Sequence, residues 1–296
     1  MRNEGQPTSP EQESLSSEQE GVDIEKQQAE LVAQIEEARE AKDTARLVDL
    51  FGQLEAISLP PKEKGDLDQE TIKQNQKLYD WLGLEVNLQQ EYEQGNILLP
   101  TSEQKEAAEK EGYTLQLIIP GHLDRDQLIN QIKQKYASEF NSEGIFFYSQ
   151  AQQDLSSTQA IKQNPRAHQP YLILLNPQGL RDAHPDTMNK TFPQAQKILE
   201  QENQSNPQLN LKGLTLQEAL MADAQSHLSS NKHLDQDLWA WHWLLEEQVL
   251  NESGKSVRCL GAYWYPDDRR VRVDSRSSES HGGDGGARFA AVPKVS

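Results

Sequence analysis

The sequence contains almost no cysteine: Cys259 is the single cysteine among 296 residues. One cysteine excludes an internal disulfide framework and any metal site built on several thiolates. We expect Cys259 to be a small buried hydrophobic residue, because free cysteine is among the most buried residue types. A reactive thiol is the alternative.

Long apolar segments are absent as well. No run of 18 apolar residues occurs, and the opening residues, MRNEGQPTSPEQESLSSEQE, lack the apolar core of a signal peptide. The sequence therefore predicts no membrane span and a cytoplasmic location, with surface display by another route left open.

Positive charge is scarce. The chain has 29 Lys and Arg against 47 Asp and Glu, a net charge of −18. This balance argues against nucleic-acid binding, because phosphate contacts need a basic face. A local basic cluster nevertheless lies near the C-terminus and consists of Arg258, Arg269, Arg270, Arg272 and Arg276.

Apolar residues make up 35% of the chain, fewer than in an average globular protein, so we expect part of the length not to pack. Residues 1–21 are rich in Glu, Gln, Ser and Pro and predict a disordered tail. Residues 22–60 carry apolar side chains at helical spacing and predict a helical hairpin or a short coiled coil. This arm either packs on its own chain or self-associates through residues 22–58.

Residues 61–112 predict a helical linker region, with helices that begin at the capping residues Asp68 and Thr101. Residues 113–296 predict a mixed α/β region. Its expected strands are 113–119, 144–148, 171–175, 257–260, 263–265, 270–274 and 287–292. Four helices are expected in this region: one that begins at Asp124, one over 193–202, one from Thr215 to Asn231 and one over 234–250. Residues 151–169 are expected to form a loop. Helices followed by a cluster of short strands predict an α+β fold with a small antiparallel sheet and flanking helices.

Catalytic, metal and cofactor motifs are missing. The seven histidines do not fall at ligand spacing, and Gly282–Gly286 has the composition of a phosphate cradle without the strand, helix or Lys-Ser/Thr pair that such a loop needs. We therefore expect no catalytic residue, no metal and no cofactor. Trp239 and Trp243 are expected on one helix face as core aromatics, with a ligand platform as the alternative.

The C-terminal stretch alternates between apolar and polar residues. In Arg270-Val271-Arg272-Val273-Asp274, a strand would direct the valines inward and their neighbours outward. In Tyr263-Trp264-Tyr265 we expect Trp264 to point inward and both tyrosines outward. Tyr, Arg, Asp, Ser, His and Gly on an outward face are typical of a binding surface, although a solvated hairpin has the same composition.

The composition also changes abruptly at this end. Gln, Glu and Lys account for 78 of the first 260 residues, but only Glu279 occurs in residues 262–288. The replacing residues, Tyr, Asp, Arg, Ser, His and Gly, all have codons that end in a pyrimidine. Such codons remain when the adenines of AAC or AAT asparagine codons are randomised.

These features resemble the variable proteins of diversity-generating retroelements, in which adenine-directed mutagenesis linked to a reverse transcriptase rewrites the final segment of a C-type-lectin-like domain. The family frame reads YW-x-P-x-x-R-x-V-x-V-x and closes on a Gly-Ala-Arg segment. This sequence keeps Tyr263, Trp264, Pro266, Arg269, Val271, Val273, Gly286, Ala287, Arg288, Ala290 and Pro293. Residues 211–228 and 232–245 also look like helices of the family's lectin domain.

The resemblance implies recognition rather than catalysis, with an unknown, macromolecular ligand. A variable segment at about 262–288 would present Tyr265, Asp268, Arg270, Arg272, Asp274, Arg276, Ser277, Ser278, Ser280, His281 and Asp284. The scaffold of the site would be Trp264, Val271, Val273, Gly286 and Arg288. Glu279 departs from the pattern, because randomised asparagine codons do not reach glutamate.

Two other functions stay open at this point. A structural or assembly protein would use the N-terminal helices. An enzyme on the related fold that generates formylglycine would need active-site cysteines, and Cys259 alone does not supply the usual pair. Calcium-dependent sugar binding is not supported, since the EPN/QPD and WND motifs of lectins are absent.

Overall fold

A computed structural model describes residue 34 and residues 67–121, 123–156, 169–234, 241–250, 256–281 and 285–294. The chain divides into two compact units, 1–63 and 64–296. The expected tail at 1–21 lies outside the described residues. Of the expected hairpin at 22–60 only Gln34 is described, and it is helical.

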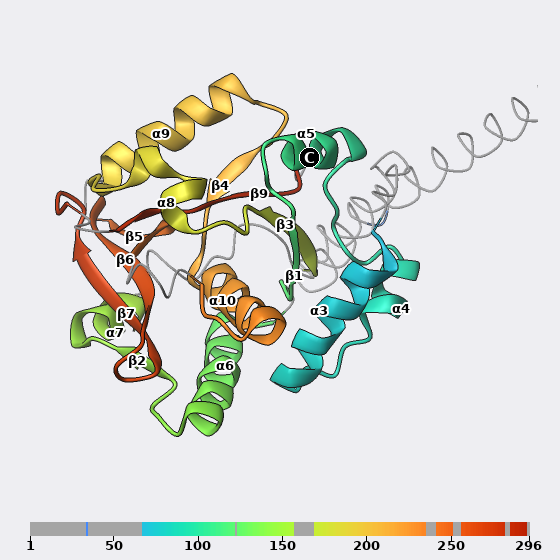
Figure 1. Ribbon diagram of the computed structural model, residues 1–296, viewed down its shortest axis with the longest axis horizontal. Helices are drawn as coiled ribbons and strands as arrows, with labels where there is room; N and C mark the ends of the chain where they lie inside the picture. Colours follow the sequence, from blue (N-terminus) through green and yellow to red (C-terminus); the bar gives the residue numbers. More distant parts are fainter. Residues whose placement is uncertain are drawn as a thin grey trace, which may run out of the picture. The chain divides into compact units, whose positions relative to one another are not determined.

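The second unit mixes helices and strands, which confirms the α+β prediction (Figure 1). Its helices are α3 (Gln69–Leu82), α4 (Leu88–Glu93), α5 (Ser102–Lys110), α6 (Arg125–Phe140), α7 (Ser149–Ser156), α8 (Leu180–Ala183), the 3-10 turn η1 (Pro185–Thr187), α9 (Phe192–Ser205) and α10 (Leu216–Ser230). Its strands are β1 (Leu115–Ile119), β2 (Ile145–Phe147), β3 (Tyr171–Leu175), β4 (Leu211–Gly213), β5 (His242–Leu250), β6 (Ser256–Tyr265), β7 (Arg270–Ser277), β8 (Gly286–Ala287) and β9 (Phe289–Ala291).

Short polar side chains fix the starts of several helices, as the sequence predicts. Asp68 accepts a hydrogen bond from the amide of Thr71, and Thr101 accepts one from the amide of Gln104. Thr215 and Glu218 form a reciprocal capping box at the start of α10. Each cap satisfies amides that the first helical turn leaves without an intrahelical acceptor.

The first sheet has the order β1-β3-β9-β4 and is antiparallel throughout. Side-chain amides from two helices cover its edge strands. Asn75 of α3 donates to Gln116 O and accepts from Ile118 N, and Asn203 of α9 bonds both the amide and the carbonyl of Leu211. Both contacts occupy backbone groups that an open sheet edge would offer to another chain.

The second sheet has the order β2-β7-β6-β5-β8 and is mixed rather than antiparallel. β5, β6 and β7 pair antiparallel, whereas β2 lies parallel to β7 and β8 lies parallel to β5. The segments expected as two short strands, 257–260 and 263–265, form the single strand β6. α6, α7 and α10 pack against this sheet (Figure 1).

Two predictions of secondary structure were wrong. The expected helix over 234–250 is the strand β5 from His242 onward, and residues 235–240 lie outside the described residues. Long-range pairing with β6 overrides the local pattern there. Trp243, expected on a helix face, therefore lies in a strand, and Trp239 is outside the described residues. Part of the expected loop at 151–169 belongs to the helix α7.

A polar and aromatic network fills the core between the second sheet, α6 and α10. Trp264 of β6 stacks on the imidazole of His233, with ring centroids 3.3 Å apart. His233 Nδ1 lies 2.9 Å from Asp223 Oδ2, which also accepts a hydrogen bond of 2.6 Å from the Tyr136 hydroxyl. His227, stacked on His233, lies 2.7 Å from Glu139 Oε1 through Nε2. Each of these side chains except Trp264 thereby makes at least one hydrogen bond, while the buried Nδ1 of His227 has no partner in the described part of the chain.

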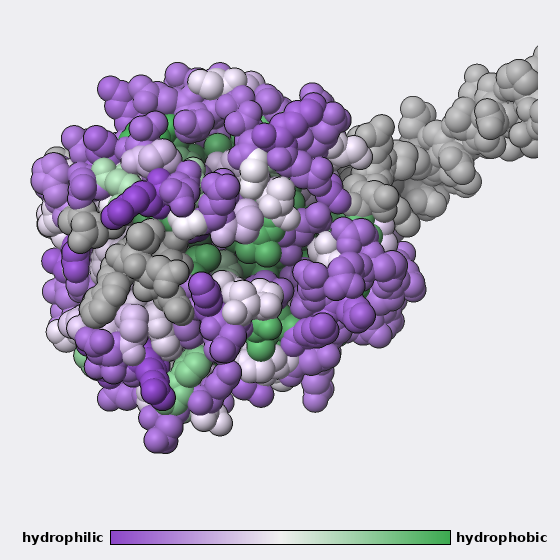
Figure 2. Space-filling view, viewed as in Figure 1, coloured by the Kyte–Doolittle hydropathy of each residue, from purple (hydrophilic) through white to green (hydrophobic). Residues whose placement is uncertain are grey.

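Residues 67–112, expected as a helical linker region, contribute to the same core. Leu78 and Tyr79 of α3 and Leu88 of α4 are fully buried. Among the described residues, the exposed large hydrophobic side chains are Leu228, Leu250 and Val257, and the side of the molecule in Figure 2 is predominantly hydrophilic. No helix in the described part of the chain is both long and apolar enough to cross a membrane.

Glu247 of β5 is a buried carboxyl group whose Oε1 accepts a 2.9 Å hydrogen bond from the amide of Leu216. Burial raises its pKa from 4.5 to about 7. Because the folded state then binds the proton more tightly than the unfolded state, this stabilisation is complete below pH 4.5 and is lost as the pH rises to about 7. The loss is on the order of 3 kcal/mol.

We therefore predict that Glu247→Gln, which keeps the acceptor for Leu216 but cannot ionise, gains stability relative to the unchanged protein as the pH rises. Urea denaturation at a series of pH values between about 4 and 8 measures the difference. Parallel stability curves for the two proteins would contradict the prediction.

Candidate functional site

The side chains of β6 and β7 point alternately to the two sides of the second sheet, as the alternation of apolar and polar residues in the sequence predicts. Trp264 pairs with Val271 and Ala262 pairs with Val273, and all four side chains are buried on the core side. Their neighbours Tyr263, Tyr265, Arg270 and Arg272 are only partly buried. Since paired residues in a ladder point to the same side, these four side chains share the opposite side of the sheet.

This opposite side forms a surface that we call the aromatic–arginine face. Strand β2 contributes Phe146, which is paired with Arg272, and the following Tyr148 packs edge-on against the Phe146 ring. The segment before β5 contributes Trp241. The members of the face are Phe146, Tyr148, Trp241, Tyr263, Tyr265, Asp268, Arg270, Arg272, Asp274 and Arg276.

Gly261 makes room for Trp241 within the face. A Cβ at position 261 would lie 2.2 Å from two carbons of the Trp241 ring and 2.7 Å from the carbonyl oxygen of His242. Only glycine fits such an approach without moving its neighbours. The Trp241 ring therefore occupies the side-chain position of residue 261, next to Tyr263 at a centroid distance of 5.7 Å.

Each arginine of the face lies over an aromatic ring. The guanidinium carbon of Arg272 is 3.4 Å from the centre of the Tyr265 ring, and that of Arg270 is 4.5 Å from the Phe146 ring. Arg276 lies 4.1 Å above Trp241. Contacts of this kind are worth about 0.5–1 kcal/mol each at exposed sites. They hold the three guanidinium groups in defined positions on the sheet.

Asp268, in the turn between β6 and β7, binds two of these arginines. Its Oδ2 accepts hydrogen bonds from Arg270 and Arg272, and Arg270 also bonds Glu143 at 2.6 Å. The hydrogen bond from Arg272 is the main cause that lowers the pKa of Asp268. Burial acts to lower the pKa of Arg272, but Asp268 and Tyr263 outweigh it and raise that pKa. Burial raises the pKa of the Tyr263 phenol.

We predict that Arg272→Gln raises the pKa of Asp268 toward its ordinary value, because it removes the largest cause of the lowered pKa. A pH titration of the side-chain carboxyl carbons by NMR measures this change. Arg276→Gln is the matched control, since Arg276 pairs with Asp274 instead. Equal Asp268 pKa values in the two variants would refute the prediction.

The remaining residues of the predicted ligand-binding set divide among three environments. Asp274 and Arg276 pair on the sheet, and Arg276 is 39% exposed. Ser277 and His281 are exposed and Ser280 is partly exposed. The prediction that Ser278 lies on the ligand-binding surface was wrong. Ser278 is 2% exposed and donates a hydrogen bond to Ser256 O, so it belongs to the interior. Asp284 lies outside the described residues.

The predicted scaffold residues are buried. Gly286 packs against Thr187, where an added Cβ would lie 2.7 Å from the hydroxyl oxygen. Arg288 is 1% exposed and its guanidinium donates to the carbonyl oxygens of Asn176 and Gln178 at 2.7 and 3.0 Å. A buried arginine held by carbonyls connects the C-terminal strands to the loop after β3.

The interior position of Cys259 was correctly predicted: the thiol is free and fully buried. Burial raises its pKa to about 12, so the thiol form dominates at neutral pH. In the described part of the chain, no group of three or more His, Cys, Asp or Glu residues is placed to hold a metal ion.

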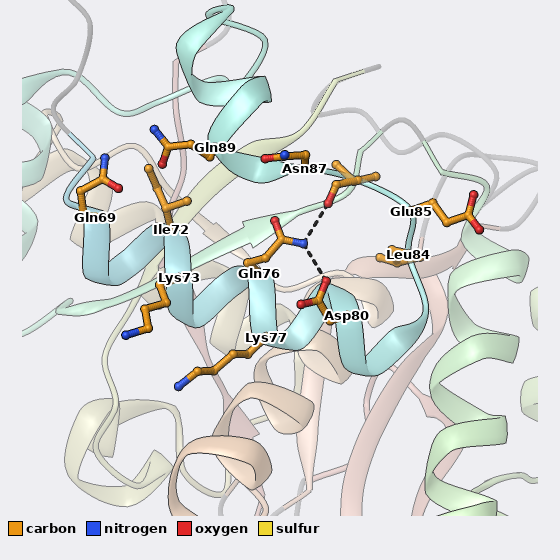
Figure 3. Close-up of a pocket in the computed structure, with 11 residues that line it drawn as sticks. Gln69, Ile72, Lys73, Gln76, Lys77, Asp80, Leu84, Glu85, Asn87 and Gln89 are labelled. Carbon is orange, nitrogen blue, oxygen red and sulfur yellow. Dashed lines mark hydrogen bonds between the residues drawn. The ribbon is translucent and has the colours of Figure 1, made fainter.

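A groove lies along α3 and α4 (Figure 3). Its side chains already satisfy one another, since Gln76 donates to Asp80 Oδ1 and to Val86 O and accepts from Leu88 N. Ile72 and Leu84 at its base are 4% and 7% exposed.

Sequence reasoning missed three members of the face: Phe146, Tyr148 and Trp241. A signal for the first two exists in the sequence Ile145-Phe146-Phe147-Tyr148, which a strand divides between two sides. The parallel pairing of β2 with β7, which brings them to the face, joins residues more than 120 positions apart in the chain.

The fold and the face together define an α+β protein with a mixed sheet that presents ordered aromatic and arginine side chains. Comparison of the chain with protein-family models, with curated proteins and with solved structures finds no match.

Proposed function

We propose that this chain is a ligand-binding protein in which the part of the aromatic–arginine face contributed by residues 262–288 is diversified by adenine-directed mutagenesis linked to a reverse transcriptase. The face is carried on a C-type-lectin-like scaffold and recognises a macromolecular target. The proposal combines the geometry of the second sheet with the family resemblance of residues 262–293.

The observation that carries the proposal is the agreement between burial and the family frame. Among the frame residues, eight are buried: Trp264, Val271, Val273, Gly286, Ala287, Arg288, Ala290 and Pro293. Of the residues expected to vary, Ser278 alone among the described ones is buried. Partly exposed positions tolerate changes of side chain far better than packed ones do. A protein diversified at these positions would keep its core.

The chemistry of the face suits recognition. Tyrosine and arginine are enriched among the residues that supply most of the affinity at interfaces, and tyrosine buries a large area at a low cost in conformational entropy. Here the arginines already lie over aromatic rings, so binding would order fewer side chains. Two carboxylates, Asp268 and Asp274, pair with these arginines and balance much of the charge of the face.

Inspection of the gene and its surroundings tests the proposal most directly. We expect a neighbouring reverse-transcriptase gene and a near-copy of the codons for residues 262–288 that differs at adenines. We also expect Glu279 to have a codon outside the randomised set. An intact locus that has neither the gene nor the near-copy would refute diversification, although binding by the face could still be tested with fixed ligands.

A further inference from the structure

A second site is suggested by a cavity of about 180 Å³ on the side of the first sheet. It lies among α9, β4, η1 and the residues after α5, and α8, α9 and β4 can be followed in Figure 1. No member of the aromatic–arginine face lines it. The cavity is therefore a separate feature of the same unit.

The inner wall of the cavity is aromatic. Tyr113, His184 and Phe289 line it, and these residues are 6%, 7% and 1% exposed. The His184 ring lies 4.7 Å from the Phe289 ring and 6.1 Å from the Tyr113 ring. Aromatic faces carry negative electrostatic potential and attract cations.

His184 adds no positive charge to this wall. Its Nε2 accepts a hydrogen bond of 3.3 Å from the amide of Phe289. A ring nitrogen that accepts a hydrogen bond carries no proton at that atom.

The rim of the cavity is acidic. Glu111, Asp186 and Glu202 are exposed carboxylates among the lining residues, and no lysine or arginine lines the cavity. The nearby guanidinium of Arg288 is bound by the carbonyl oxygens of Asn176 and Gln178. The cavity therefore combines a neutral aromatic wall with three negative charges at its mouth.

Tyr113 is 94% buried, and its hydroxyl has no hydrogen-bond partner in the described part of the chain; the oxygen is not among the fully buried unpartnered atoms, so it remains accessible from the cavity that the residue lines. Burial raises the pKa of this phenol, the charges of Glu202 and Glu111 raise it further, and the nearby Arg288 guanidinium acts against them with a smaller effect. The hydroxyl thus stays protonated and lies within the field of both carboxylates. A hydroxyl that faces the cavity without a protein partner is free to bond a ligand there.

We propose that this cavity binds an alkylammonium group. An ammonium N–H would donate to the Tyr113 hydroxyl and to the carboxylates, while the attached alkyl carbons would contact the aromatic wall. The volume is below the roughly 300–1,000 Å³ of pockets that take drug-sized ligands, so it suits a small amine or the end of one lysine side chain. Among the described residues, no three carboxylates or other metal ligands lie close enough together to hold a metal ion. The cavity therefore suits an organic cation better than a metal ion.

The test is a titration of the full-length chain by NMR with n-butylammonium, with the neutral isostere 1-butanol, and with a lysine blocked at both backbone ends. We expect saturable binding of n-butylammonium with a Kd of about 1–10 mM, and at least about tenfold weaker binding of 1-butanol. If the blocked lysine binds at least as tightly as n-butylammonium, the ammonium group that the cavity recognises belongs to a protein side chain. If it binds more weakly, the natural ligand is a small-molecule amine.

Variants on one helix provide the matched control. Glu202→Gln is expected to weaken n-butylammonium binding about three- to tenfold, and Glu200→Gln, an exposed neighbour on α9 that does not line the cavity, is expected to leave it unchanged. Tyr113→Phe is expected to weaken binding about threefold without loss of a protein hydrogen bond. Equal affinity for the amine and the alcohol, equal affinity in the two glutamate variants, or no saturation below about 50 mM would each overturn the proposal.

Discussion

Trp264→Ala is expected to reduce the free energy of unfolding by about 3–5 kcal/mol, whereas Tyr265→Ala is expected to reduce it by no more than about 1 kcal/mol. The two residues are neighbours on β6 but point to opposite sides of the sheet. Trp264 is 7% exposed and stacks on His233 inside the core. Tyr265 is partly exposed and contacts Arg272 on the face.

Urea or guanidinium denaturation of the two variants and of the unchanged protein measures this difference. Unchanged m-values would show that the compactness of the end states is unaffected. Similar losses of stability in the two variants would contradict the division of β6 into a buried side and a replaceable side. That result would also weaken the proposed function, which requires tolerance at Tyr265.

Arg288→Met is expected to have an effect of similar size, about 2–5 kcal/mol. The substitution keeps much of the side-chain volume but leaves the carbonyl oxygens of Asn176 and Gln178 without these donors inside the protein. Arg288→Lys is also expected to lose more than about 2 kcal/mol, because an ammonium group cannot reproduce the two-pronged geometry of a guanidinium.

Arg276→Met is the matched control for this substitution. Arg276 is 39% exposed and pairs with Asp274 at the surface, so its replacement is expected to cost less than about 1 kcal/mol. Thermal unfolding of the three variants in one buffer gives the comparison. A loss at Arg276 as large as the loss at Arg288 would show that the face contributes to the stability of the fold.

The starts of helices were predictable because their signals are local. Asp68, Thr101, Asp124 and Thr215 each accept a hydrogen bond from an amide two or three residues further on, so a few residues of sequence contain the whole interaction. The alternation of β7 was predictable for a similar reason. The pleat of a strand sends every second side chain to the same side, whichever strand it pairs with.

The strand β5 was not predictable from local pattern. Tryptophans at positions 239 and 243 match helical spacing, and two adjacent leucines hide the alternation of a strand. Pairing of His242 with Ala262 and of Trp243 with Gly261 decides the outcome. A single sequence does not show which strand will be the partner.

The candidate site was likewise predictable only where its residues are placed by local pattern. The residues that β6 and β7 contribute could be read from alternation, but Ser278 could not, because its hydrogen bond to Ser256 O depends on how two separated segments meet. Trp241 could not be placed on the face either. Its position depends on the space above Gly261. A glycine in a strand can also mark a bulge or a bend, so the sequence alone does not show that this one makes room for a ring.

If the face is diversified as proposed, the carboxylate that Asp268 shares between two arginines limits how its positions can vary. Two arginines, Arg270 and Arg272, bond the same oxygen of Asp268, so a change at residue 268 alters the surroundings of both. Substitutions at these three positions should therefore be non-additive in a double-mutant cycle. Combinations would be selected together rather than one position at a time, and the repertoire of useful surfaces would be smaller than the product of the choices at each position.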